Sequence, residues 1–129
     1  MDSHTYNCLV VDDEPIARRI MLNYIAQMPS LQLAAQCINA LTAIEYLRTH
    51  QEVDILFLDI NMPHLSGLQL LKILEPRQPV IFTTAYSEFA VESYELNAAD
   101  YLLKPFSFDR FAKGVYKAID AIKTNRNKV

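Results

Sequence analysis

The sequence predicts an α/β fold in which a five-stranded parallel sheet is covered by helices on both faces. Five short apolar runs alternate with five amphipathic segments along the 129 residues, and this alternation is typical of a doubly wound sheet. Four of the runs are continuously apolar, as expected for parallel strands that are buried on both faces. Right-handed crossovers restrict the strand order, and 2-1-3-4-5 is a common order for five strands.

The five predicted strands are residues 8–11, 31–37, 55–58, 80–82 and 101–103. The second run differs from the others, because its apolar residues alternate with Gln32 and Gln36. Alternation is typical of a strand with one wetter face. We therefore expect residues 31–37 to lie near an edge of the sheet.

Helix signals follow each of the first three runs. The first helix opens at Pro15, which an opening turn tolerates, and its predicted buried stripe is Ile16, Ile20, Tyr24 and Met28. Asn39 is the predicted N-cap of the second helix, which turns inward Ala40, Ile44 and Leu47. The third helix runs from Gly67 and stops at Pro76, with an apolar stripe of Leu68, Leu71 and Leu74.

Two further helices follow. Ser87 is the predicted N-cap of the fourth, with Glu88 near its positive end. Ser107 caps the fifth, whose apolar positions are Phe108, Phe111, Val115, Ile119 and Ile122. Gly114 inside this helix is unfavourable by ~1 kcal/mol relative to Ala, and the sequence offers no reason for it beyond close packing. Residues 1–122 are expected to form one domain, and the polar residues 123–129 a linker or tail toward an output domain outside these 129 residues.

Composition excludes several classes of protein. A formal charge of −3 does not favour direct nucleic-acid binding. The apolar settings of Cys8 and Cys37 predict buried free thiols rather than a disulfide. There is no signal-peptide pattern and no apolar stretch near the ~20 residues that cross a bilayer. We expect a soluble, cytoplasmic protein without membrane contact.

Residues that could bind a ligand or take part in a reaction stand directly after four of the apolar runs: Asp12-Asp13, Asp59, Thr83-Thr84 and Lys104-Pro105. Loops at the carboxyl ends of parallel strands line the ligand crevice of such sheets. In the order 2-1-3-4-5 the four contributing strands are neighbours, so their ends are predicted to meet at one patch.

Three carboxylates in one patch repel one another unless a cation joins them. An all-oxygen set without His or Cys favours a hard cation, and Mg²⁺ fits because it leaves positions for phosphate oxygens. Lys104 would add a second positive charge, and Thr84 a hydroxyl donor. Because a carboxylate can act as a nucleophile toward phosphorus, one of these aspartates could accept a phosphoryl group.

The combined motifs resemble those of response-regulator (CheY-like) receiver domains, which have the flavodoxin-like (βα)5 fold. They are residues 10–15 (VVDDEP), residues 58–63 (LDINMP) with Gly67, Thr84-Ala85 and Lys104-Pro105, and the similarity spans about residues 7–122. The resemblance implies that Asp59 is the phosphorylated residue, Asp13 a direct Mg²⁺ ligand and Asp12 a ligand through water. It further implies that the backbone carbonyl of Asn61 is the third protein ligand.

The same resemblance assigns a switch role to Thr84 and Tyr101 and a phosphoryl-binding role to Lys104, whose bond to Pro105 is commonly cis in the family. It implies a two-component phosphorelay. A sensor histidine kinase would donate the phosphoryl group, and the domain would be a signalling phosphoacceptor rather than an enzyme. The face formed by the fourth helix, fifth strand and fifth helix would then change, so that the domain forms a homodimer or releases its own output domain.

Residues 82–87, 90–91 and 100–106 are similar to receivers that precede LytTR-type DNA-binding domains, which implies transcription regulation. One alternative is a stand-alone receiver that acts by protein–protein interaction. Another is a Mg²⁺-dependent phosphatase, although such enzymes generally carry an Asp-x-Asp nucleophile motif after the first strand. A flavin- or nucleotide-binding module would need a Gly/Ser/Thr-rich loop where Asp12 and Asp13 stand.

Overall fold

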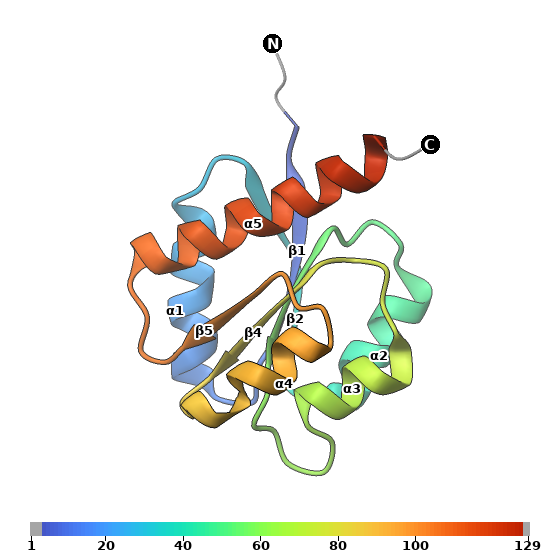
Figure 1. Ribbon diagram of the computed structural model, residues 1–129, viewed down its shortest axis with the longest axis vertical. Coiled ribbons are helices and arrows are strands. Elements are labelled where there is room, and N and C mark those ends of the chain that lie inside the picture. The colour runs from blue at the N-terminus through green and yellow to red at the C-terminus, as the bar shows by residue number, and fades with distance from the viewer. Residues whose placement is uncertain (1–3, 128–129) are drawn as a thin grey trace.

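One parallel sheet in the order β2-β1-β3-β4-β5 forms the centre of the computed structural model, which describes residues 4–127. This order and the α/β class confirm the predicted topology. The strands are β1 (Tyr6–Val11), β2 (Leu31–Cys37), β3 (Ile55–Asp59), β4 (Val80–Thr84) and β5 (Asp100–Leu103). The helices are α1 (Pro15–Ala26), α2 (Ala40–Thr49), α3 (Gly67–Leu74), the short η1 (Ser87–Phe89), α4 (Ala90–Glu95) and α5 (Phe108–Asn127). Figure 1 labels α1 to α5 around the sheet.

The sheet has a hydrophobic core on each face. Ile55 and Phe57 of β3 point into the core beneath α1 and α5, whereas Leu56 and Leu58 point into the core beneath α2 and α3. Successive side chains of a strand face opposite sides, so a strand with two covered faces must be apolar at every position. This explains the continuous apolar run of β3. The alternating strand, β2, lies at the sheet edge as expected.

The buried stripe predicted for α1 is wrong in part. Ile16 and Ile20 are 72% and 43% exposed, and Met21 and Ile25 are buried in their place. Helix α1 carries apolar residues on two stripes, and the predicted stripe faces solvent at its first two positions, whereas Tyr24 is partly buried against the core. Met28, just past the helix, is buried as predicted.

Helix α3 is anchored by a device that the sequence analysis did not identify. Ser66 and Gln69 form a capping box, in which each side chain accepts a hydrogen bond from the other residue's backbone N–H. A Cβ atom on Gly67 would lie 2.4 Å from the backbone oxygen of Asp59. The start of α3 therefore packs directly against the end of β3, which fixes the loop that follows Asp59.

The predicted cap of the fourth helix is also wrong. Ser87 lies inside the short 3-10 turn η1, and α4 itself begins only at Ala90. Tyr86, in the extended conformation just before η1, makes no side-chain capping hydrogen bond. A serine followed by an acidic residue fits an α-helical start, but here the chain first makes a tighter turn.

Helix α5 begins as predicted, because the Ser107 hydroxyl accepts the Arg110 N–H at 3.1 Å. A Cβ atom on Gly114 would lie 3.0 Å from Asp100 Oδ2, which explains this glycine by close packing against β5. The helix continues through Asn127, so residues 123–127 are helical, and the rest of the predicted tail lies outside the described residues.

Cys8 and Cys37 are buried free cysteines, as predicted. Over residues 4–127, none of the helices combines the length and the apolar character that crossing a membrane requires.

Candidate functional site

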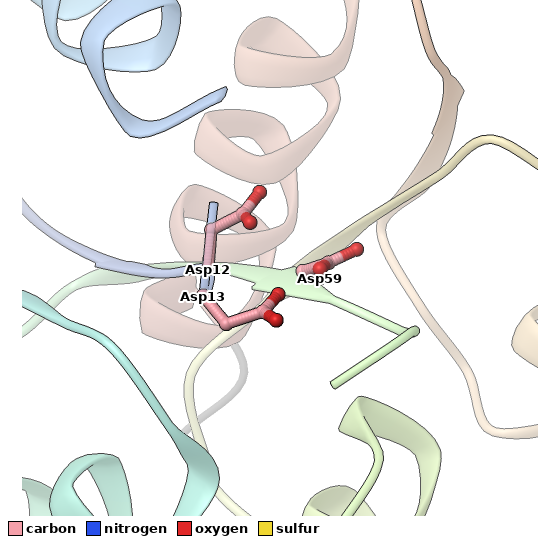
Figure 2. Close-up of side chains that lie close together, drawn as sticks. All are labelled: Asp12, Asp13 and Asp59. Atoms are coloured by element: carbon pink, nitrogen blue, oxygen red, sulfur yellow. The ribbon is translucent and has the colours of Figure 1, made fainter. Parts of the chain in front are cut away.

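The carboxyl ends of β1 and β3 bring three acidic side chains together, as the sequence predicted. One carboxylate oxygen from each of Asp12, Asp13 and Asp59 lies within 4.8 Å of the others (Figure 2). Asp59 is the last residue of β3, and Asp12 and Asp13 follow β1 directly. Since β1 and β3 are hydrogen-bonded neighbours, their ends must lie side by side.

Lys104 reaches the same place from the end of β5. Its ammonium nitrogen lies 3.0 Å from Asp12 Oδ2, 3.4 Å from Asp59 Oδ1 and 3.4 Å from Glu14 Oε1. Burial acts to lower the pKa of Lys104, but the carboxylates of Asp59, Asp12 and Glu14 together raise it above its ordinary value. Lys104 is therefore a permanent cation at this site. Its peptide bond to Pro105 is cis, as the resemblance implied.

The two oxygens of Asp12 both have partners within the protein. Oδ1 accepts the Glu14 N–H at 3.0 Å, and Oδ2 accepts from Lys104. The carboxylate is buried, and these two bonds hold it in one orientation.

Asp13 differs from Asp12 in this respect. Its Oδ1 is buried and, within residues 4–127, has no hydrogen-bond partner. An unpaired buried carboxylate oxygen is unfavourable, because it has lost water without gaining another donor. Together with the all-oxygen donor set, this oxygen fits a site for a hard divalent cation.

Asp59 lies in an environment that opposes its ionisation. Burial and the charge of Asp12 raise the pKa of Asp59 from 3.8 to about 7, although Lys104 and the Asn61 N–H act in the opposite direction. Its side chain is almost entirely buried, at 3% exposure. A carboxylate with this environment gains from any further positive charge that enters the pocket.

Thr84 and Tyr101 lie on the neighbouring strands β4 and β5. The Thr84 hydroxyl donates to Asn61 Oδ1 at 2.5 Å and accepts the Tyr86 N–H at 3.2 Å. The Tyr101 hydroxyl donates to the Tyr86 backbone carbonyl. The loop after β4 therefore connects the loop after β3 to β5.

An ion pair behind the site was missed in the sequence analysis. Asp100 is fully buried and paired with Arg110, whose guanidinium lies 2.5 Å and 2.9 Å from the two carboxylate oxygens and also donates to the Tyr101 carbonyl. Burial acts to raise the pKa of Asp100, but the hydrogen bonds from Arg110 lower it overall. An aspartate at the start of an apolar run with an arginine ten residues later is the only signal in the sequence, and it is weak alone.

The fold and this pocket define a doubly wound α/β domain with one carboxylate cluster and one lysine at the carboxyl edge of its sheet. Comparison with known proteins agrees with that class. The family model of the response regulator receiver domain matches residues 8–116. The chain therefore belongs to the response regulator receiver domain family.

Individual relatives support this assignment. The chain is 38% identical to the transcriptional regulatory protein BtsR of Escherichia coli over 107 residues, 81% of this chain and 44% of that protein. The structure resembles the response regulatory domain of mrkE from Klebsiella pneumoniae with a TM-score of 0.83 and 30% identity, covering 92% of this chain and 98% of that one. It also resembles a chain in the crystal structure of the CheA3 P1 domain in complex with CheY6 from R. sphaeroides, with a TM-score of 0.79, 25% identity, and 91% and 98% covered.

The chain spans about half the length of the curated relatives it matches, 45% and 49% in two response regulatory proteins.

Proposed function

We propose that this domain receives a phosphoryl group on Asp59 in a Mg²⁺-dependent reaction and thereby switches between two conformations. The observation that carries the proposal is the arrangement of Asp12, Asp13 and Asp59 within 4.8 Å of one another, with Lys104 beside them. Three carboxylates and one lysine leave an excess of negative charge, which a divalent cation would offset.

The residues that would hold Mg²⁺ are Asp13 and Asp59 directly, the Asn61 backbone carbonyl, and Asp12 through water. The unpartnered oxygen of Asp13 supports a direct role, and the two internal hydrogen bonds of Asp12 support an indirect one. When bound, Mg²⁺ would neutralise charge that develops on the phosphoryl oxygens.

The chain's own residues would supply the nucleophile and a second positive charge. An oxygen of Asp59 attacks the phosphorus of a phosphohistidine, the P–N bond breaks, and the imidazole nitrogen keeps the electron pair and takes up a proton. Lys104, at 3.4 Å from Asp59 Oδ1, can stabilise the charge on a phosphoryl oxygen from one side. Thr84 would donate its hydroxyl hydrogen to another phosphoryl oxygen.

The output would be a shift between two arrangements of Thr84 and Tyr101, driven by contacts that only the phosphorylated state makes. The face of α4, β5 and α5 would change with them. Apolar side chains of α4 and β5 are exposed, which supports a homodimer or an interdomain contact there: Val91, Tyr94 and Leu103.

For the whole protein we propose a cytoplasmic two-component response regulator. A sensor histidine kinase would be the phosphoryl donor, and an output domain, of LytTR type by resemblance, would act on transcription. The curated relatives support an output domain because they extend well beyond the matched segment, and one is named a transcriptional regulatory protein. In this account the receiver is a signalling phosphoacceptor and makes no direct nucleic-acid contact. The reading frame beyond Val129 tests the output domain.

Labelling with acetyl phosphate and Mg²⁺ tests the acceptor. The wild type should gain one phosphoryl group, which peptide mass spectrometry should locate on Asp59, and Asp59→Ala should gain none. Label that persists on Asp59→Ala would reject Asp59 as acceptor. Omission of Mg²⁺ is the matched control, and it should abolish labelling of the wild type.

A further inference from the structure

A chain of hydrogen bonds joins the loop after β3 to β5 by way of Thr84. The Thr84 hydroxyl donates to Asn61 Oδ1 at 2.5 Å and accepts the Tyr86 N–H at 3.2 Å. The carbonyl of Tyr86 in turn accepts from the Tyr101 hydroxyl. The backbone of Tyr86 is therefore held from both sides, by Thr84 through its nitrogen and by Tyr101 through its oxygen.

The Thr84 hydroxyl has a single hydrogen, and Asn61 holds it. A hydroxyl donates only one hydrogen bond, so Thr84 cannot donate to Asn61 and to a phosphoryl oxygen at the same time. Thr84 is 0% exposed, so bulk water does not compete for this hydrogen. A state in which Thr84 binds a phosphoryl group on Asp59 must first break the bond to Asn61.

We propose that the carboxamide of Asn61 is a latch: a positioning group that holds Thr84 in the unphosphorylated arrangement and sets how strongly the phosphoryl group must compete for it. This inference rests on the proposed function, in which Thr84 donates to the phosphoryl group. A hydrogen bond to an ionised acceptor is about twice as strong as one between neutral groups. The hydrogen bond from Thr84 to the phosphoryl group is therefore the stronger of the two. Its net contribution to phosphoryl binding is reduced, because the bond from Thr84 to Asn61 must be broken first.

The latch also explains how a change in the loop after β3 is transmitted to Tyr101. When Thr84 turns away from Asn61, the hydroxyl oxygen that accepts the Tyr86 N–H moves with it. The backbone of Tyr86 then loses one of its two supports, and the hydrogen bond to Tyr101 is free to rearrange. Asn61 acts here through its side chain only. Its backbone carbonyl, the proposed metal ligand, remains when the side chain is changed.

The test is the affinity for beryllofluoride, a phosphoryl mimic, measured by calorimetry in the presence of Mg²⁺. Asn61→Ala removes the acceptor, and Asn61→Leu removes it while keeping most of the side-chain bulk. Because Asn61 is exposed, both variants should fold. Each should bind beryllofluoride about fivefold more tightly than the wild type, which corresponds to about 1 kcal/mol.

The control is to repeat the Asn61 substitution in a Thr84→Val variant, which lacks the hydroxyl that Asn61 binds. If Asn61 acts through the Thr84 hydroxyl, then Asn61→Ala should give no gain in affinity when combined with Thr84→Val. An NMR measurement adds a readout of the switch itself. Without beryllofluoride, the Tyr86 amide and Tyr101 ring signals of Asn61→Ala should move toward their positions in the beryllofluoride-bound wild type.

The possible results separate this inference from the function on which it rests. Unchanged or weaker affinity in both Asn61 variants, with normal binding by the wild type, would overturn the latch and leave the function standing. A gain that persists in the Thr84→Val background would also overturn it, because Asn61 would then act by another route. A wild type that fails to bind beryllofluoride would overturn the proposed function and the latch together.

Discussion

The ammonium nitrogen of Lys104 lies 3.4 Å from Oδ1 of Asp59, although the two residues are 45 positions apart in the sequence. From the end of β5, the positive charge of Lys104 offsets the negative charges of Asp12 and Asp59. Removing it leaves Asp12 and Asp59 to repel each other in a buried setting.

We expect Lys104→Met to slow labelling of Asp59 by acetyl phosphate by about 10–100-fold, because a charge-assisted hydrogen bond contributes roughly 1.5–3 kcal/mol. The pKa of Asp59, followed by NMR of its carboxyl carbon, should rise further. Lys104→Arg retains the charge and should lose less of the labelling rate. Equal rates for the wild type and Lys104→Met would contradict a phosphoryl-binding role.

Neutralising Asp59 should stabilise the metal-free protein. The folded-state pKa of about 7 lies above the ordinary 3.8, so ionised Asp59 opposes folding above about pH 4 and does so fully above pH 7. Asp59→Asn should therefore raise the free energy of unfolding by about 1–2 kcal/mol at pH 8. This gain is smaller than the free energy that corresponds to the whole pKa shift of Asp59, because Lys104 loses a partner in the variant. The gain should vanish near pH 4.

Urea denaturation at both pH values measures this difference, and Asp120→Asn, at an exposed position of α5, is the control for loss of a surface charge. Mg²⁺ should stabilise the wild type more than Asp59→Asn. A metal-free Asp59→Asn variant that is less stable than the wild type at pH 8 would argue against the electrostatic account of this pocket.

The Asp100–Arg110 pair lies outside the carboxylate cluster, and we expect it to contribute to the free energy of unfolding. Arg110→Met leaves the fully buried Asp100 without its main partner and should cost about 2–3 kcal/mol at pH 7, below the usual value for a buried pair because the Arg110 side chain is 37% exposed. The pKa of Asp100 is lowered in the folded state, so the pair stabilises above about pH 4 and its effect is lost as pH falls.

Thermal or urea unfolding of Arg110→Met at pH 7 and pH 3.5 would reveal this trend. Lys117→Met is the matched control, since Lys117 lies 3.5 Å from the same carboxylate with 56% of its side chain exposed, and it should change stability by about 0.5 kcal/mol. Equal losses for the two variants would contradict the assignment of Arg110 as the main partner.

The two glycines should respond differently to alanine. At Gly67 the new Cβ would lie 2.4 Å from the backbone oxygen of Asp59, and backbone cannot yield as a side chain can. We expect a loss of about 2–3 kcal/mol and slower labelling of Asp59, because the acceptor loop must shift. At Gly114 the contact is 3.0 Å with Asp100 Oδ2.

For Gly114→Ala we expect a net loss of about 1 kcal/mol, because a helix gain of ~1 kcal/mol offsets part of the strain. Labelling should be unaffected, since Gly114 lies behind β5. Chemical denaturation and the labelling assay together check both variants, and a stabilised Gly67→Ala would contradict the close packing of α3 on β3.

Sequence alone was sufficient for the sheet order and for the cluster of Asp12, Asp13 and Asp59, because strand ends in a parallel sheet converge whatever the details of packing. The sequence-based prediction was wrong for the buried face of α1, where two apolar patterns are present. Helix α1 has two apolar stripes, and only contact with the sheet decides that Met21 and Ile25 are buried.

Two other features depend on three-dimensional pairing that spacing does not encode. Asp100 and Arg110 are ten residues apart on different elements, and either could have been a solvated surface residue. The hydrogen bond from Thr84 to Asn61 joins residues 23 positions apart. The resemblance placed both residues near the acceptor, but not in contact with each other.

A crystal structure with Mg²⁺ and beryllofluoride would show whether the carboxylate cluster holds a metal ion beside a phosphoryl mimic. We expect an ion bound to Asp13, Asp59 and the Asn61 carbonyl, with beryllofluoride on Asp59 and with Lys104 and Thr84 against its fluorines. A pocket that contains neither ion nor beryllofluoride, with the three carboxylates turned to separate regions, would contradict this expectation.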